Sequence, residues 1–165
     1  MPVTYEPIAT TTLASAASTI TFSSISSGYT DLRLVLMGTA TAALTPRIRL
    51  NGDTATNYSN TFLYGDGTSA LSARTTNSTF FNVTYNTSWS STIPAMVTTD
   101  IFSYAGSTNK TALTTASVDQ NGSGSVERIV SLWRSTAAIT SITILSSAST
   151  FAAGTTATLY GIKAA

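Results

Sequence analysis

The sequence contains no histidine and no cysteine, and only 9% of its residues are charged. Without histidine, the chain has no side chain whose unperturbed pKa lets it exchange protons near neutral pH. Without cysteine, it has no thiolate nucleophile, no disulfide and no thiolate ligand for zinc. These absences remove most of the groups that proteins use in catalysis. We therefore expect a protein that is not an enzyme and that holds no cofactor or metal.

Charge is scarce in both signs, with eight basic and seven acidic residues and a net charge of +1. A soluble protein usually carries about 25% charged residues. Arg47 and Arg49 are the only close basic pair, so the clustered basic side chains of nucleic-acid-binding proteins are missing. No run approaches the roughly 18 apolar residues of a membrane span, and the first residues lack the pattern of a signal peptide. We expect neither nucleic acid nor membrane as a partner.

Hydroxyl side chains take the place of charges. About a third of the 165 residues are serine or threonine, and 42% are hydrophobic. Disordered chains combine low hydrophobicity with high net charge, and this chain has neither property. Its length fits one domain with a core of its own. Because a weakly charged surface protects poorly against association, the composition also favours an ordered oligomer or a place in a larger assembly.

Hydrophobic residues recur with a period of two, which is typical of half-buried antiparallel strands. Leu32, Leu34 and Leu36 share one face of a segment at 31–37, and Ile48 and Leu50 share one face of a segment at 47–50. Further segments rich in β-branched and aromatic residues lie at 19–22, 61–64, 79–85, 97–104, 111–118, 126–133, 139–145 and 157–162. Glycine-containing turns separate them. The pattern predicts an all-β, jelly-roll-like antiparallel β-sandwich of about eight to ten strands.

The first eight residues differ from the rest of the chain. Pro2 and Pro7 disfavour both a helix and a central strand, so residues 1–8 are predicted to form an extended N-terminal arm, followed by a single sandwich domain at 9–165. We expect this arm to lie against a neighbouring chain. Its predicted assembly contacts are Pro2, Tyr5, Pro7 and Ile8.

Two patterns suggest chemistry, but each has a simpler explanation. Asp53 and Asp66 would form a glycosidase-like carboxylate pair if they met, yet each adjoins glycine in a turn, where aspartate commonly caps its own backbone. The segment 119–124 begins like a calcium loop, but Val130 stands where that motif requires glutamate. We interpret all three sites as turns.

Aromatic residues offer another kind of site, because an aromatic ring can stack on the apolar face of a sugar. The candidates are Tyr58, Tyr64, Tyr85, Trp89, Tyr104 and Trp133. Most lie in alternating segments, where packing in the core is the ordinary role of such rings. Trp89 is the residue that we expect to be exposed and to contact a glycan, if the protein binds one.

Several short segments of the sequence together resemble those of a protein family. They lie at 5–13, 29–36, 49–53, 57–59, 63–67, 104–110, 132–140 and 158–163, and the last of them, TLYGIK, is the most recognisable. In these segments the chain is similar to small virion structural proteins of tailed bacteriophages. The resemblance spans nearly the whole chain, but none of the segments is a catalytic motif.

The resemblance implies a β-sandwich module that decorates a capsid or belongs to a tail appendage, with no enzymatic activity. The function expected first is that of a capsid decoration (cement) protein, made in the bacterial cytoplasm and then placed on the capsid surface of the virion. It would form a homotrimer, bridge subunits of the major capsid protein and stabilise the head. The alternative is a tail-fibre or receptor-binding module that recognises host surface glycans, with Trp89 as a contact.

Overall fold

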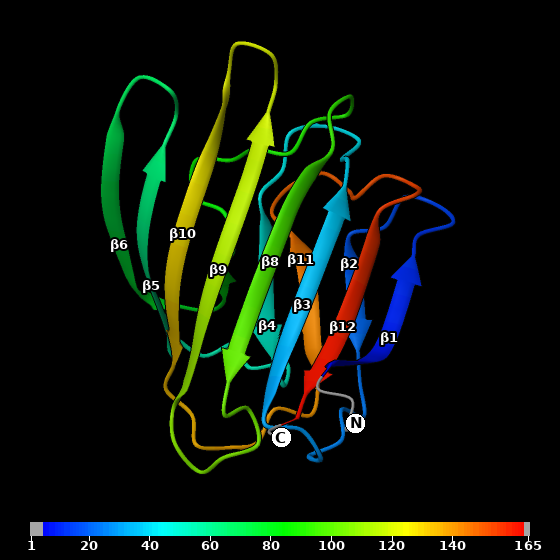
Figure 1. Ribbon diagram of the computed structural model, residues 1–165, viewed down its shortest axis with the longest axis vertical. Coiled ribbons are helices and arrows are strands. Elements are labelled where there is room, and N and C mark those ends of the chain that lie inside the picture. Colours follow the sequence, from blue (N-terminus) through cyan, green and yellow to red (C-terminus); the bar gives the residue numbers. More distant parts are fainter. Residues whose placement is uncertain (1–4, 164–165) are drawn as a thin grey trace.

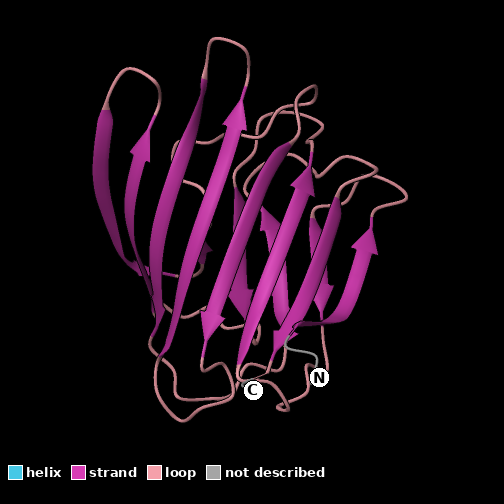
Figure 2. Cartoon of the chain, viewed as in Figure 1, coloured by secondary structure: helices cyan, strands magenta, loops and turns pink. Residues whose placement is uncertain are grey.

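The computed structural model describes residues 5–163, and within this range it consists of β-strands joined by loops, without a helix (Figure 2). The predicted all-β antiparallel fold is confirmed. The strands are β1 (Tyr5–Thr12), β2 (Thr19–Phe22), β3 (Asp31–Gly38), β4 (Pro46–Leu50), β5 (Tyr58–Gly65), β6 (Ala70–Ser78), β7 (Phe81–Asn82), β8 (Ala95–Phe102), β9 (Lys110–Asp119), β10 (Gly124–Trp133), β11 (Ile142–Ser146) and β12 (Thr156–Ile162).

The strands form two sheets of unequal size. The larger is eight-stranded, in the order β1-β12-β3-β8-β9-β10-β5-β6, and the smaller is four-stranded, in the order β2-β11-β4-β7. In Figure 1 the smaller sheet lies behind β8, β3 and β12, whereas β5 and β6 extend to the side beyond it. The molecule is therefore an asymmetric sandwich, in which one end of the large sheet reaches past the small one.

The core lies between the sheets and follows the predicted alternation. Leu32, Leu34 and Leu36 of β3 are buried, as are Ile48 and Leu50 of β4. Burying a side chain of this size stabilises a fold by about 1.5–3 kcal/mol. The inward faces predicted for these two strands are confirmed.

The structure contains two strands more than the upper limit of the prediction. Ten strands correspond to the ten predicted segments, although the segment at 79–85 is reduced to the two residues of β7. The two strands that were missed are β1 and β6, which are the outermost strands of the large sheet. Most residues of β6 are exposed, so this strand lacks the hydrophobic alternation that would have revealed it.

The predicted N-terminal arm needs correction at residues 5–8. Tyr5 pairs with Ile162 and Pro7 with Tyr160, so these residues belong to β1 and hydrogen-bond within their own chain. The register shifts between Pro7 and Ala9. Proline is tolerated here because β1 is an edge strand with an irregularity at that point. Residues 1–4 of the predicted arm lie outside the described residues.

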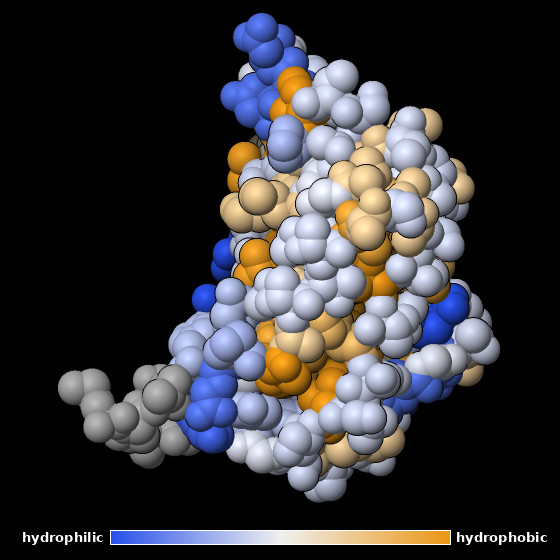
Figure 3. Space-filling view, turned by 90° about the vertical axis from the view of Figure 1, so that its right-hand side faces the viewer, coloured by the Kyte–Doolittle hydropathy of each residue, from blue (hydrophilic) through white to orange (hydrophobic). Residues whose placement is uncertain are grey.

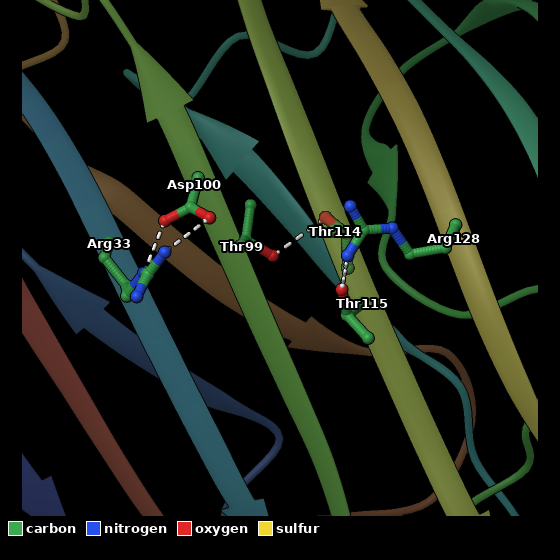
Figure 4. A network of polar contacts seen from close by, with 6 residues as sticks. All are labelled: Arg33, Thr99, Asp100, Thr114, Thr115 and Arg128. Atoms are coloured by element: carbon green, nitrogen blue, oxygen red, sulfur yellow. Dashed lines mark hydrogen bonds and ion pairs between the residues drawn. The ribbon is translucent and has the colours of Figure 1, made fainter.

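Polar side chains also join neighbouring strands of the large sheet (Figure 4). Arg33 of β3 donates two hydrogen bonds, of 2.5 and 2.9 Å, to the carboxylate of Asp100 on β8. On β10, Arg128 donates to the hydroxyl of Thr115 at 2.7 Å. These contacts hold adjacent strands together near the middle of the sheet.

Within residues 5–163, no helix has the length and apolar character to cross a membrane.

Candidate interaction surfaces

The most extensive surface without a covering layer is the outer face of the eight-stranded sheet, which is turned toward the viewer in Figure 1. Side chains on this face alternate with the buried residues of the core. Its exposed hydrophobic residues are Met37, Leu63, Met96, Phe102, Val126 and Val130. Met37 and Met96 are paired across β3 and β8. We refer to this surface as the outer face.

Hydroxyl groups also belong to the outer face. On β1 and β12, Thr10 bonds Thr158 and Thr12 bonds Thr156, both at 3.1 Å between hydroxyl oxygens. Arg33 is paired with Asp100, and this bond raises the pKa of the arginine. Arg128 and Arg74 hydrogen-bond to the threonine hydroxyls of Thr115 and Thr61 and have no carboxylate partner among residues 5–163. The outer face therefore combines apolar and hydroxyl groups with one ion pair and two arginines that bond hydroxyl groups. Seen from the β1 side, most of the surface has intermediate hydropathy, and strongly hydrophilic residues form separate patches (Figure 3).

The residues predicted as assembly contacts lie at one edge of the large sheet. Tyr5 is 43% exposed, and its ring lies 6.3 Å from that of Tyr160 in an edge-on arrangement. Pro7 is exposed, whereas Ile8 is half-buried and packs against the core. Pro2 lies outside the described residues. The structure thus brings Tyr5, Pro7 and Ile8 together in β1, next to the outer face.

Trp89 is not exposed, and its prediction as a glycan contact is wrong. The side chain is 1% exposed and packs edge-on against Phe151 at 5.8 Å. The backbone N–H of Trp89 donates to the carbonyl of Leu44 at 2.9 Å, which holds the residue in an isolated β-bridge. A large apolar ring gains more from this burial than from exposure to water, so the core takes it.

The remaining aromatic candidates divide into two groups. Tyr58, Tyr104 and Trp133 are buried in the core. Tyr64 and Tyr85 instead lie near the free end of the β5–β6 hairpin, with ring centroids 5.3 Å apart. Tyr85 is 44% exposed. A pair of tyrosines is therefore available at the surface, whereas the sequence predicted the exposed aromatic residue to be Trp89.

Asp53 and Asp66 do not meet. They flank β5, whose eight residues span about 25 Å at roughly 3.3 Å per residue. Burial raises the pKa of Asp53, but hydrogen bonds from Asn57, Trp133 and the backbone of Ala55 outweigh it and lower the pKa overall. Its carboxylate serves to fix the loop before β5. A glycosidase-like pair is excluded by this separation.

Asp66 caps its own turn, as the sequence suggested. Its Oδ1 accepts hydrogen bonds from the backbone and hydroxyl of Thr68 and from the backbone of Ser69. The Thr68 hydroxyl, followed by these backbone bonds, lowers the pKa of Asp66 to about 2. The carboxylate is therefore ionised at any physiological pH.

The calcium-like segment is a hairpin turn between β9 and β10. Asn121 donates its backbone N–H to Asp119 Oδ1 at 2.8 Å, and Gln120 donates its own to the carbonyl of Ser123 at 2.8 Å. Asn121 and Gly122 have positive φ angles of 54° and 111°. No group of three or more carboxylates is found among residues 5–163. The interpretation of this segment as a turn is confirmed.

A cavity of about 390 Å³ lies between the tips of the β5–β6 and β9–β10 hairpins, and we call it the tip pocket. Strands β5 and β10 are paired as far as Gly65 and Val126, and the two turns continue beyond that point. Most of the lining residues have polar side chains, among them Asp66, Thr68, Asn86, Thr87, Gln120 and Ser125, and Val118 adds an apolar one. The loop that follows β7 supplies Asn86 and Thr87, so three separate segments form this pocket.

Glu127 is a residue of this region that sequence analysis missed. It lies on β10 with no exposed surface, and its carboxylate accepts backbone hydrogen bonds from Tyr85 at 2.5 Å, Asn86 at 2.8 Å and Thr87. The sequence pattern could have identified it. Glu127 lies two residues before Ile129 on the same strand, so both side chains point to the inner face of the sheet. These bonds replace strand pairing after β7, which explains why the segment predicted at 79–85 is not a long strand.

Lys110 is a second buried charge. Its ammonium group donates to the carbonyls of Gly106, at 2.7 Å, and Thr108. Burial lowers its pKa. The side chain therefore closes the loop before β9 and takes no part in a surface site.

Comparisons with known proteins identify no relative. No protein-family model matches the chain, and neither a characterised protein nor a solved structure matches it.

Proposed function

We propose that this protein is a structural subunit of a bacteriophage particle and most specifically a capsid decoration protein. The observation that carries the proposal is the uncovered outer face, on which exposed apolar side chains lie on β3, β5, β8 and β10. Contiguous exposed apolar surface commonly marks a site of protein association. The sequence resemblance supplies the phage context.

In this proposal the outer face contacts the major capsid protein, and the β1 edge with Tyr5 contacts a second copy in a homotrimer. A stable interface buries about 1,200–2,000 Å² in total. A closed threefold arrangement would match the local threefold axes of a capsid. The stabilising effect is mechanical, because many copies bridge neighbouring shell subunits and each contact adds to the others. No catalytic step is involved.

Copy number in purified virions tests the proposal directly. Quantitative mass spectrometry of intact particles should find this protein in simple proportion to the major capsid protein, with hundreds of copies in each particle. A handful of copies would contradict a decoration role and would favour the alternative, a tail-fibre or receptor-binding module. Absence from the particle would contradict both.

Charged substitutions test the surface that attaches. Leu63 and Val130, which are 57% and 49% exposed on the outer face, would be replaced together by lysine. We expect occupancy on particles lacking the protein to fall about tenfold or more, since two charges would lose their hydration in the contact. The matched control is Thr21→Lys, because Thr21 is exposed on the small sheet. Equal loss in the control, or no loss in the double variant, would contradict attachment through the outer face.

A further inference from the structure

We propose that the tip pocket, together with Tyr64 and Tyr85 beside it, is a binding site for a neutral saccharide. The inference does not depend on whether the protein decorates a head or belongs to a tail. It gives the particle an adhesive site at the end of the molecule where the β5–β6 and β9–β10 hairpins project (Figure 1).

The tyrosine pair supplies an aromatic surface of fixed position. The ring of Tyr85 lies 4.5 Å from that of buried Phe62 and 5.3 Å from that of Tyr64. Tyr85 directly precedes Asn86, and Tyr64 lies two residues before Asp66, both of which line the pocket. Neither ring lines the pocket itself, but Tyr64 is paired with Glu127, whose carboxylate bonds the backbone of Tyr85 and of Asn86 in the lining. The rings therefore lie beside the residues that form the pocket. An exposed tyrosine offers an apolar ring together with a hydroxyl, which suits a ligand whose faces are apolar and whose edges are polar.

The pocket supplies hydrogen-bonding groups that the fold itself leaves available. Asp66 uses Oδ1 for its own turn, while its Oδ2 has no hydrogen bond within residues 5–163. Over the same range, the side-chain amide of Asn86 has no partner either, although its backbone is bonded to Glu127. A carboxylate oxygen accepts hydrogen bonds, and an amide both donates and accepts them. This combination matches vicinal hydroxyl groups, and the volume lies within the roughly 300–1,000 Å³ of small-molecule sites.

Charge decides which class of saccharide fits. The lining contains no lysine or arginine, and its one carboxylate is Asp66. The low pKa of Asp66 keeps this negative charge at physiological pH. A phosphate, sulfate or carboxylate on the ligand would meet repulsion without a compensating cation. A neutral sugar, whose hydroxyls donate to the carboxylate, avoids this cost.

The site is also held in place before any ligand arrives. The buried carboxylate of Glu127 accepts the backbone N–H groups of Tyr85, Asn86 and Thr87. The Thr87 and Ser125 hydroxyls bond each other across the base of the pocket. Because the loop is fixed by these bonds, little conformational entropy remains to be lost on binding.

Saturation-transfer difference NMR of the full chain tests the site. The probes are glucose, galactose, N-acetylglucosamine and their disaccharides, with sialic acid and glucuronic acid as anionic comparators. We expect transfer to at least one neutral sugar and none to the acids. Absence of transfer to every neutral probe, or a preference for the acids, would overturn the proposal.

Variants then locate the binding. Asp66→Asn keeps the Oδ1 acceptor of the turn and replaces Oδ2 with a donor, so we expect roughly tenfold weaker binding. Tyr85→Ala should abolish detectable transfer. Tyr5→Ala is the matched control, since Tyr5 is 43% exposed on β1 and should leave binding unchanged. If Tyr85→Ala does not fold by circular dichroism, Asp66→Asn and Asn86→Ala decide the question. Unchanged binding in both Asp66→Asn and Asn86→Ala would overturn the proposed site, whatever the copy number in virions.

Discussion

Single buried polar residues organise the loops of this protein. Glu127 and Lys110 both lie inside the sandwich with no exposed surface, and both bond backbone groups of loops. A buried charge is stable only when such bonds compensate for its lost hydration. Loop conformation in this fold therefore depends on a few side chains, whereas strand conformation depends on the alternation of many.

Replacing Glu127 with alanine should destabilise the protein strongly. Three backbone N–H groups would lose their acceptor in a buried place, at about 1–3 kcal/mol for each group that remains unsatisfied. We expect a loss of at least ~3 kcal/mol in the free energy of unfolding, measured by urea denaturation. Glu6→Ala is the control, because the Glu6–Lys163 ion pair is at the surface and its loss should change little. Equal effects of the two variants would contradict the proposed role of Glu127.

The carboxylate of Asp53 should make stability depend on pH in acid. Its pKa in the folded protein lies below the usual 3.8, so the folded state favours the ionised form more than the unfolded state does. The resulting stabilisation is complete above about pH 4 and is lost as pH falls through the folded-state pKa. Urea midpoints at several pH values should fall less steeply in acid for Asp53→Asn than for the unaltered protein. Parallel curves would show that Asp53 does not contribute.

At the scale of elements, the two edge strands of the large sheet differ in how well they are protected against pairing with another chain. Strand β1 carries Pro7, a register shift and the Glu6–Lys163 ion pair, which hinder pairing with another sheet. Strand β6 runs for nine residues with Arg74 as its one charged side chain. An edge of this kind is the more open to pairing with another chain.

Removal of residues 1–8 should weaken β1 without unfolding the sandwich. The deletion takes away the pairing of Tyr5, Glu6 and Pro7 with β12 and the half-buried Ile8. We expect a loss of at most ~2 kcal/mol, because little of this surface is fully buried. Because the deletion removes Tyr5 and Pro7 from the proposed trimer contact, sedimentation velocity should show less trimer than for the unaltered protein. Removal of residues 1–4 alone is the control, and an unfolded 1–8 deletion would show that β1 is essential to the core.

At the scale of the whole molecule, the unequal sheets create two different surfaces. The outer face is broad and is formed mostly by apolar and hydroxyl groups, whereas the overhanging hairpins form a small pocket that offers polar side chains. The first suits association with another protein, and the second suits a small ligand. One chain can carry both because the surfaces lie on different parts of the fold.

Attachment through the outer face should depend only weakly on salt. Most of the outer face is apolar or carries hydroxyl groups, and such contacts are not screened by ions. Its cations without a carboxylate partner among residues 5–163 are Arg74 and Arg128. We expect particle occupancy to be nearly the same after washing at about 0.05 M and about 0.5 M sodium chloride, a range over which the Debye length falls about threefold. Release at the higher concentration would point to an electrostatic contact elsewhere on the surface.

The sequence by itself determined the fold class and the orientation of the strongest strands. Alternation in β3 and β4 is a local property of the backbone, so it needs no knowledge of the partner strands. The same reasoning identified the turns at Asp66 and at 119–124, whose hydrogen bonds join residues two or three apart. Features that depend on short-range geometry were therefore available from the residues alone.

Tertiary structure decided everything that depends on residues far apart in the chain. It buried Trp89 against Phe151, separated Asp53 from Asp66, joined Tyr5 and Pro7 to β12 and placed Tyr64 beside Tyr85. Edge strands such as β1 and β6 carry little hydrophobic alternation because only one neighbour and part of one face constrain them. The order of strands sets which hairpins lie side by side and which face remains uncovered. Both proposed surfaces are products of that order.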